Sequence, residues 1–176
     1  MAAATAPTRV TLEQFNELPL AEAAAALLAC CAAPSWAAAV AARRPFRTLK
    51  DLCGEAEAAA DSIAEGEWLV AFAAHPRIGD REALRTRAGW SGDEQSGVDA
   101  ASRELLHAFA QDNAEYERRF GFVFLICATG RTGPDMHAAL RARLANTRDE
   151  ELANAVREHR AITELRLRKL VHSERG

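Results

Sequence analysis

His75-Pro76-Arg77-Ile78-Gly79-Asp80 is a predicted corner between two helices. Proline disfavours helical geometry in the residue before it, so the helix indicated by residues 67–74 should end there and leave the His75 imidazole at its exit. Gly79 permits a tight turn, and Asp80 can cap a following helix. The stretch therefore predicts a helix, a turn and a second helix, with a histidine presented at the turn.

A second motif, Ser91-Gly92-Asp93-Glu94-Gln95, follows after one short connecting segment. Ser91 and Glu94 have the S-x-x-E spacing of a capping box directly before an apolar series, so we expect both, with Gln95, in the first turn of a helix that runs to about Tyr116. One imidazole, one carboxylate and one amide could then converge from two helix ends. Taken singly, each motif is more often structural than functional, because S-x-x-E usually only starts a helix and a histidine before proline is usually a loop residue.

The composition favours a helical fold. Hydrophobic residues make up 49 % of the 176 residues while aromatic residues make up only 6 %, and the excess is alanine, which suits close-packed helices. A chain of this length fits one domain. We predict an all-α, single-domain compact bundle of about eight to nine helices over residues 11–176, after a flexible lead at residues 1–10.

Charge, hydropathy and cysteine usage exclude several functional classes. Lys and Arg number 22 against 25 Asp and Glu, so no basic field exists to attract nucleic acid. No apolar run approaches the roughly 20 residues that span a bilayer, and no signal-peptide pattern is present, which predicts a soluble, unexported protein that does not bind membranes. Cys30, Cys31, Cys53 and Cys127 have no C-x-x-C spacing, so a reducing, cytoplasmic compartment is expected.

The histidines give no metal-binding pattern. The five of them, at positions 75, 107, 137, 159 and 172, lack H-x-H and H-E-x-x-H spacing, and no G-x-S-x-G turn, G-x-G-x-x-G or P-loop is present. We therefore expect no metal and no cofactor. A histidine near its ordinary pKa of about 6.5 can both give and take a proton at neutral pH, and a nearby carboxylate steadies its charged form. His75 and Glu94 fit these two roles.

The apolar run Phe122-Val123-Phe124-Leu125-Ile126 is ambiguous from propensity alone, which favours a strand. No second strand pattern is present to pair with it, so we predict a buried helix or a helix with an irregular end over residues 120–129. The final helix is expected from Glu150 to about His172. Arg166 lies on the stripe of that helix that faces the body of the protein, where most arginines only snorkel or pair with an acid.

The two motifs together resemble the signature of the 2-oxo-4-hydroxy-4-carboxy-5-ureidoimidazoline (OHCU) decarboxylase family. The resemblance extends over residues 11 to 171, with further matching segments in the same order. They are Leu18-Pro19, Cys30-Cys31, Trp36, Arg44-Pro45-Phe46, Arg119-Phe120-Gly121-Phe122, Phe124-x-Ile126-Cys127-Ala128, Arg143-Leu144-x-Asn146 and Ile162-Thr163-Glu164-Leu165-Arg166.

The resemblance implies an all-helical, cofactor-independent carboxy-lyase that converts OHCU to S-allantoin and CO2, the last step of urate oxidation to allantoin. It also implies a homodimer. By position in the family motifs, His75 and Glu94 would be catalytic, although the division of roles between them stays a hypothesis. The implied substrate-binding residues are Pro76, Ser91, Gln95, Ile126 and Arg166.

Two alternatives remain open at the level of sequence. A non-catalytic helical binding module would need only an alanine-rich helical chain, but it leaves the His-Pro corner and the capping box unexplained together. A hydrolase acting on a related ureido compound would use the same residues and would release ammonia or open the ring. The sequence also leaves open whether the protein associates with a hydroxyisourate hydrolase.

Overall fold

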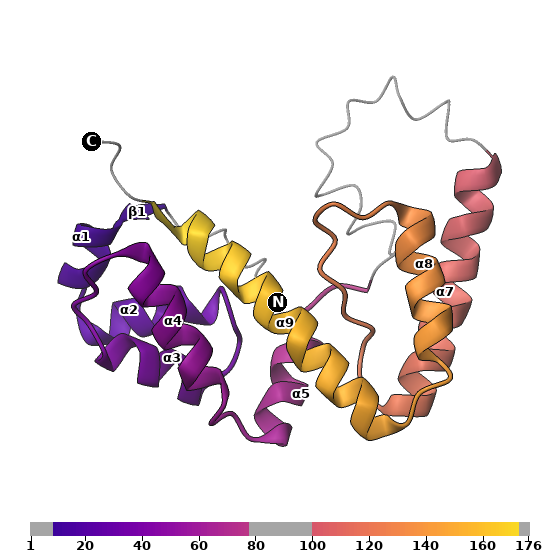
Figure 1. Ribbon diagram of the computed structural model, residues 1–176, viewed down its shortest axis with the longest axis horizontal. Helices are drawn as coiled ribbons and strands as arrows, with labels where there is room; N and C mark the ends of the chain where they lie inside the picture. Colours follow the sequence, from indigo (N-terminus) through magenta and orange to yellow (C-terminus); the bar gives the residue numbers. More distant parts are fainter. Residues whose placement is uncertain (1–8, 78–99, 173–176) are drawn as a thin grey trace. The chain divides into compact units, whose positions relative to one another are not determined.

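The computed structural model describes residues 9–77 and 100–172 (Figure 1). Within these residues the chain forms eight helices and one pair of two-residue parallel strands, so the predicted all-α class is confirmed. The elements are β1 (Val10–Thr11), α1 (Leu12–Glu17), α2 (Leu20–Leu28), α3 (Pro34–Ala42), α4 (Leu49–Ala60), α5 (Glu65–Ala73), α7 (Ala100–Phe120), α8 (Gly133–Arg143), α9 (Arg148–Leu170) and β2 (Val171–His172).

The chain divides into two compact units, residues 1–74 with 157–176 and residues 75–156. In the first unit, α1 to α5 pack with the C-terminal part of α9. Each of these helices contributes at least one large, fully buried side chain: Phe15, Leu27, Trp36, Val40, Leu52, Phe72 and Leu167. The Trp36 indole N–H donates to the Ala56 carbonyl at 2.8 Å and so fixes α3 on α4. Val10 in β1 pairs with Val171 in β2, which joins the start of the described chain to the end of α9.

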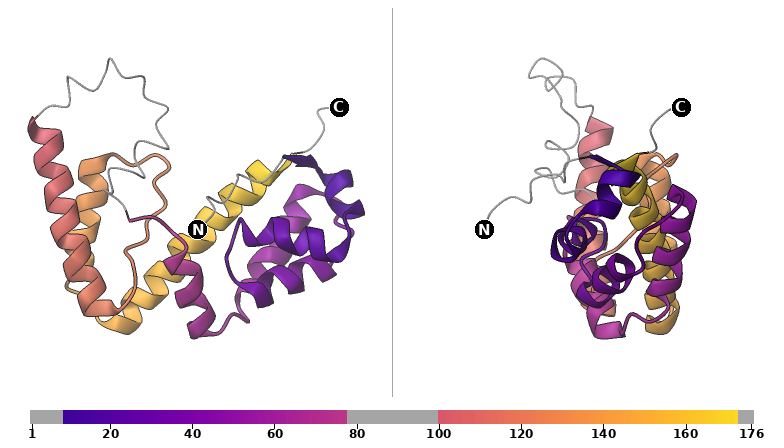
Figure 2. Two further views of the ribbon diagram at one scale, coloured as in Figure 1. Left: turned by 180° about the vertical axis from the view of Figure 1, so that it is seen from behind. Right: turned by 90° about the vertical axis from the view of Figure 1, so that its left-hand side faces the viewer.

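In the second unit, α7 and α8 lie side by side and run in the same direction (Figures 1 and 2). Their cross-helix contacts advance together along both helices: Asp112 meets His137 at 2.7 Å, and further along Tyr116 meets Arg143 at 3.3 Å. Parallel neighbours require a connection that returns along most of the first helix.

That connection corrects one prediction. Residues 120–129 were expected to form a buried helix or a helix with an irregular end, but α7 ends at Phe120 and residues 121–132 have no regular secondary structure. Gly121, at φ +82°, ends the helix in the left-handed region. A Cβ added at Gly133, the first residue of α8, would meet Leu105 at 3.3 Å, so the connection must climb from residue 120 back to the level of residue 105. That climb is about 22 Å at 1.5 Å per residue, whereas twelve helical residues would rise only about 18 Å and leave none for the turns.

Local capping residues mark the start of two helices. Thr48 accepts a hydrogen bond from the Asp51 N–H at 3.1 Å while the Asp51 carboxylate accepts from the Thr48 N–H at 3.0 Å, which completes the capping box of α4. Thr147 makes the same exchange with Glu150 at the start of α9. The helix expected before His75 is α5, which ends at Ala73.

Some predictions lie outside the described residues: the turn at Gly79 and Asp80, and the helix start at Ser91. The described part of that predicted helix is α7, which continues to Phe120 rather than ending near Tyr116. Over residues 9–77 and 100–172, no helix is both long and apolar enough to cross a membrane.

Candidate functional site

His75 lies just beyond α5 and its C-cap residue Ala74. It is buried, at 8 % exposure, and the proline that follows it disfavours continuation of the helix. Pro76 is exposed. Arg77 donates through Nε and Nη2 to the two carboxylate oxygens of Glu117 on α7, at 2.5 and 2.7 Å. This bidentate pair anchors the end of the corner on α7.

Ile126 is buried in the irregular segment that follows α7, at 5 % exposure. The carbonyl of the residue before it, Leu125, accepts a hydrogen bond from Arg143 Nη1 at 2.9 Å. The guanidinium of Arg143 also lies over the Phe124 ring, 4.7 Å from the centroid. One arginine at the end of α8 therefore contacts both the backbone and a side chain of this segment.

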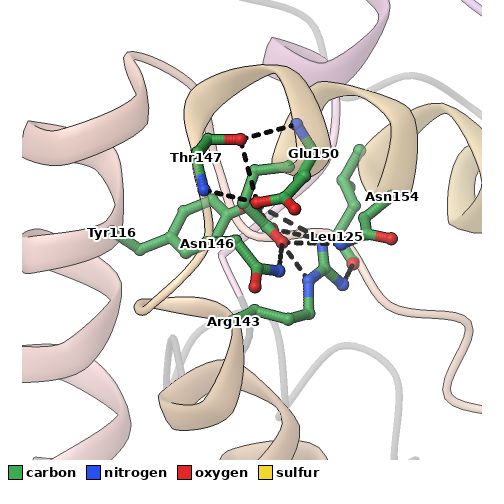
Figure 3. Close-up of polar contacts among 8 residues, drawn as sticks. Tyr116, Leu125, Arg143, Asn146, Thr147, Glu150 and Asn154 are labelled. Atoms are coloured by element: carbon green, nitrogen blue, oxygen red, sulfur yellow. Dashed lines mark hydrogen bonds and ion pairs between the residues drawn. The ribbon is translucent and has the colours of Figure 1, made fainter.

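Arg143 belongs to a buried polar group that we call the Glu151 cluster: Tyr116, Arg143, Asn146, Glu151 and Asn154 (Figure 3). One oxygen of the Glu151 carboxylate, Oε2, accepts from the Tyr116 hydroxyl at 2.5 Å and from Arg143 Nε at 2.8 Å. The other, Oε1, accepts from the amides of Asn146 and Asn154, each at 2.7 Å. The cluster joins α7, α8 and α9.

The hydrogen bonds of the cluster keep the Glu151 carboxylate ionised. Burial acts to raise the pKa of Glu151, but the hydrogen bonds from Tyr116, Asn154 and Asn146 and the charge of Arg143 outweigh it, and the net pKa is lowered. Burial and the bonded carboxylate raise the pKa of Tyr116 above its usual range. Glu151 is therefore ionised and Tyr116 is a neutral donor at neutral pH.

Arg166 lies on α9 in the first unit and is half-buried. Its Nη1 donates to the Cys30 carbonyl at 3.2 Å. Burial raises the pKa of the Cys30 thiol to about 12, against the lowering effect of the Arg166 charge. The Cys30 thiol is therefore neutral, and the cation beside it is Arg166.

His159 is a buried polar residue that the sequence interpretation did not single out. It is fully buried on α9, with its ring 5.3 Å from Trp68 and 5.7 Å from Phe72, and its Nδ1 lies 3.2 Å from the Thr163 hydroxyl. Burial, reinforced by the charge of Arg166, lowers the pKa of His159 to about 4. Its spacing of four residues from Thr163 places both on one helix face, which is the signal that could have found it.

A cavity of about 310 Å³ lies in the first unit, and its walls include Cys31, Trp36, Lys50, Cys53, Trp68 and Thr163. Four charged side chains on its walls form two ion pairs: Arg160 with Glu57 at 3.0 Å, and Arg168 with Glu164 at 2.7 Å. His75, Ile126 and Arg166 do not line it. We therefore assign this cavity no part in the predicted chemistry.

The predicted site residues fall into two compact units or outside the described residues. His75, Pro76 and Ile126 belong to the second unit, and Arg166 belongs to the first. Ser91, Glu94 and Gln95 lie outside the described residues. Over residues 9–77 and 100–172, no three His, Cys, Asp or Glu side chains come together as a metal site would require.

Comparison with known proteins identifies relatives across nearly the whole chain. The family model described as OHCU decarboxylase matches residues 16–168. A uric acid degradation bifunctional protein of Arabidopsis thaliana is 34 % identical over 145 residues, which are 80 % of this chain and 45 % of the relative. A 2-oxo-4-hydroxy-4-carboxy-5-ureidoimidazoline decarboxylase of Haloferax volcanii is 28 % identical over 131 residues, 74 % of this chain and 77 % of the relative. The chain thus spans less than half of the bifunctional relative's length.

A solved structure supports the same relationship. The crystal structure of an OHCU decarboxylase in the presence of (S)-allantoin superposes with a TM-score of 0.68 at 32 % identity, and the match covers 81 % of this chain and 94 % of that one. The family match over residues 16–168 includes both the His-Pro corner and the Ser-x-x-Glu-Gln motif. The chain belongs to the OHCU decarboxylase family.

Proposed function

We propose that this protein decarboxylates OHCU to (S)-allantoin and CO2, the last step of urate oxidation to allantoin, as a cofactor-independent carboxy-lyase. The observation that carries the proposal is the family match over residues 16–168, together with a relative and a solved structure that bear the name of this activity. The buried position of His75 directly after a helix supports it, because a general acid or base needs a fixed place.

The reaction makes three physical demands. The C–C bond to the carboxylate must stand orthogonal to the ring π system, CO2 must leave while the electron pair enters the ring, and a proton must then reach the same carbon from one face. The substrate also decays without help to racemic product, so the site must supply both rate and handedness.

The proposed roles follow from these demands. His75 gives and takes the proton, and Glu94 sets the charge of His75 and destabilises the substrate carboxylate. Ser91, Gln95 and Pro76 position the substrate beside them. Arg166 offers a guanidinium fork to carbonyl, ureido or carboxylate oxygens, and the backbone at Ile126 contributes hydrogen bonds.

The experiment generates OHCU in place from urate with the two upstream enzymes and follows CO2 release together with the circular dichroism of allantoin. His75→Asn should abolish stereoselective turnover, while His107→Asn, a change at an exposed histidine on α7, should leave it intact. Glu94→Gln should lower turnover with a near-normal melting temperature, and Arg166→Lys should raise KM more than it lowers kcat.

Two outcomes would overturn the proposal. Wild-type rate and enantiomeric excess in a stable His75→Asn protein would mean that another group carries the proton. Release of ammonia in place of CO2 would identify the protein as a ureido hydrolase instead.

We also propose a cytoplasmic homodimer. The four cysteines are free thiols, which is typical of a reducing compartment. The homodimer rests on the family resemblance, and sedimentation at enzyme concentrations used for the assay tests it; a monomer with full activity would contradict it.

A further inference from the structure

We infer that Arg143, held by Glu151, is a positioning residue that fixes and polarises the Leu125–Ile126 peptide for substrate binding. The inference rests on the proposed function, because it takes the Ile126 backbone as part of the site. It goes beyond that function by assigning a role to the Glu151 cluster, none of whose members is proposed to touch the substrate.

The guanidinium of Arg143 makes two kinds of contact at once. Its Nε and Nη2 both lie 2.8 Å from Glu151 Oε2, while Nη1 donates to the Leu125 carbonyl at 2.9 Å. Because these nitrogens lie in one rigid plane, the direction of the Leu125 carbonyl is set by the position of Glu151. Glu151 is in turn fixed by donors from α7 and from α9.

The other side of the same peptide is not used in backbone pairing. Within the described part of the chain, the backbone N–H of Ile126 donates to no backbone carbonyl. A cation bound to a peptide carbonyl draws electron density toward the oxygen and makes the N–H of that peptide a stronger donor. The Ile126 N–H would therefore bind an oxygen of the substrate more strongly than it would without the hydrogen bond from Arg143 to the Leu125 carbonyl.

Stability alone does not account for the cluster. The Arg143 side chain is 12 % exposed and that of Glu151 is fully buried, and replacing a buried ion pair of this kind with apolar residues of similar volume is often neutral or stabilising. A segment that only filled the core between α7 and α8 would need no such pair. A segment whose backbone must keep one orientation without a helix or a sheet does need one.

Arg143→Lys tests the inference, because one ammonium cannot hold Glu151 and the Leu125 carbonyl together. We expect kcat/KM for OHCU to fall about 10- to 100-fold, through KM and with a lower enantiomeric excess of allantoin, as the loss of one charge-assisted hydrogen bond predicts. Arg118→Lys is the matched control: it makes the same substitution at an exposed arginine of α7, which pairs with Glu115 at 2.6 Å and lies outside the Glu151 cluster. In Arg118→Lys, kcat/KM should stay within about twofold of wild type.

A substrate-free measurement separates this inference from the proposed function. The Leu125 carbonyl and Ile126 amide NMR shifts should move in Arg143→Lys and stay unchanged in Arg118→Lys. If those shifts do not move in Arg143→Lys, or if Arg118→Lys loses as much kcat/KM as Arg143→Lys, the positioning role is wrong. If the wild-type protein does not consume OHCU, the proposed function fails, whatever the shifts show. Should Arg143→Lys not fold, Glu151→Gln replaces it, with the same expected loss and the same shifts.

Discussion

Acidification should destabilise this protein through one buried histidine. His159 is neutral in the folded state because its pKa is lowered from 6.5 to about 4 by burial and by the charge of Arg166. The unfolded chain therefore binds more protons at this residue between about pH 6.5 and pH 4. Stability rises with pH wherever the unfolded state binds more protons, so the contribution of His159 is complete above pH 6.5 and is lost as the pH falls toward 4.

The magnitude follows from the two pKa values. A shift of one unit corresponds to about 1.4 kcal/mol, so the full contribution is about 3 kcal/mol, and about 2 kcal/mol of it is lost between pH 7.5 and pH 5. No reduction for solvent screening applies, because His159 is fully buried. For a chain of this size, a loss of about 2 kcal/mol corresponds to about 4–8 °C in melting temperature.

The assay is thermal unfolding by circular dichroism at a series of pH values, with His159→Asn as the test variant and His107→Asn as the control. The substituted side chain would place an amide near the Thr163 hydroxyl, but an amide has no proton to gain in this pH range. We expect the variant to be less stable than wild type at pH 7.5 and to show a flatter pH dependence down to pH 5, while the control keeps the wild-type slope. An unchanged slope in His159→Asn would refute the reasoning.

Three further predictions concern the backbone, the thiols and metal dependence. Gly121→Ala should lower the free energy of unfolding by about 1 kcal/mol, because φ is +82° there. Gly54→Ala inside α4 should raise the free energy of unfolding by up to about 1 kcal/mol, because a Cβ there meets nothing within 4 Å. Urea denaturation measures both changes, and changes of the same sign would contradict the argument. Native Cys30 and Cys31, whose pKa values burial raises to about 12 and about 11, should react with a thiol reagent far more slowly than half-buried Cys127, and peptide mapping of labelled protein would expose any reversal of that order. Decarboxylation should survive exhaustive chelation and dialysis, and a lost rate that one metal ion restores would show the opposite.

Local chemistry made the helices predictable. Thr48 and Asp51 satisfy each other's backbone at the start of α4, three residues apart in the sequence, so the capping box is visible without any structure. The same holds for the proline that ends the helix before His75. The β1–β2 pair could not be predicted in this way, because its partners are 161 residues apart, from 10 to 171, and each strand has only two residues.

Short, contiguous motifs named His75 and Arg166 as candidate site residues, and their roles stay predictions. His75 is buried and Arg166 is half-buried. His159 and the Glu151 cluster were missed for one physical reason: their importance comes from desolvation and from contacts between elements. Glu151 looks like any acidic residue in the first turn of a helix until the burial of its carboxylate is known.

The wrong helix prediction and the positioning role have a common cause. A run such as Phe122–Ile126 is buried, and buried backbone must find hydrogen-bond partners, so the sequence alone favours a helix or a paired strand that supplies them internally. Here Arg143 supplies a partner from another element, at the Leu125 carbonyl. A side chain can fix a backbone carbonyl in this way only if its own position is fixed. The ionised carboxylate of Glu151 fixes the Arg143 guanidinium by accepting its hydrogen bond. The irregular segment is therefore possible because a buried ion pair stands beside it, and a change that releases Arg143 should disturb this backbone before it disturbs either neighbouring helix.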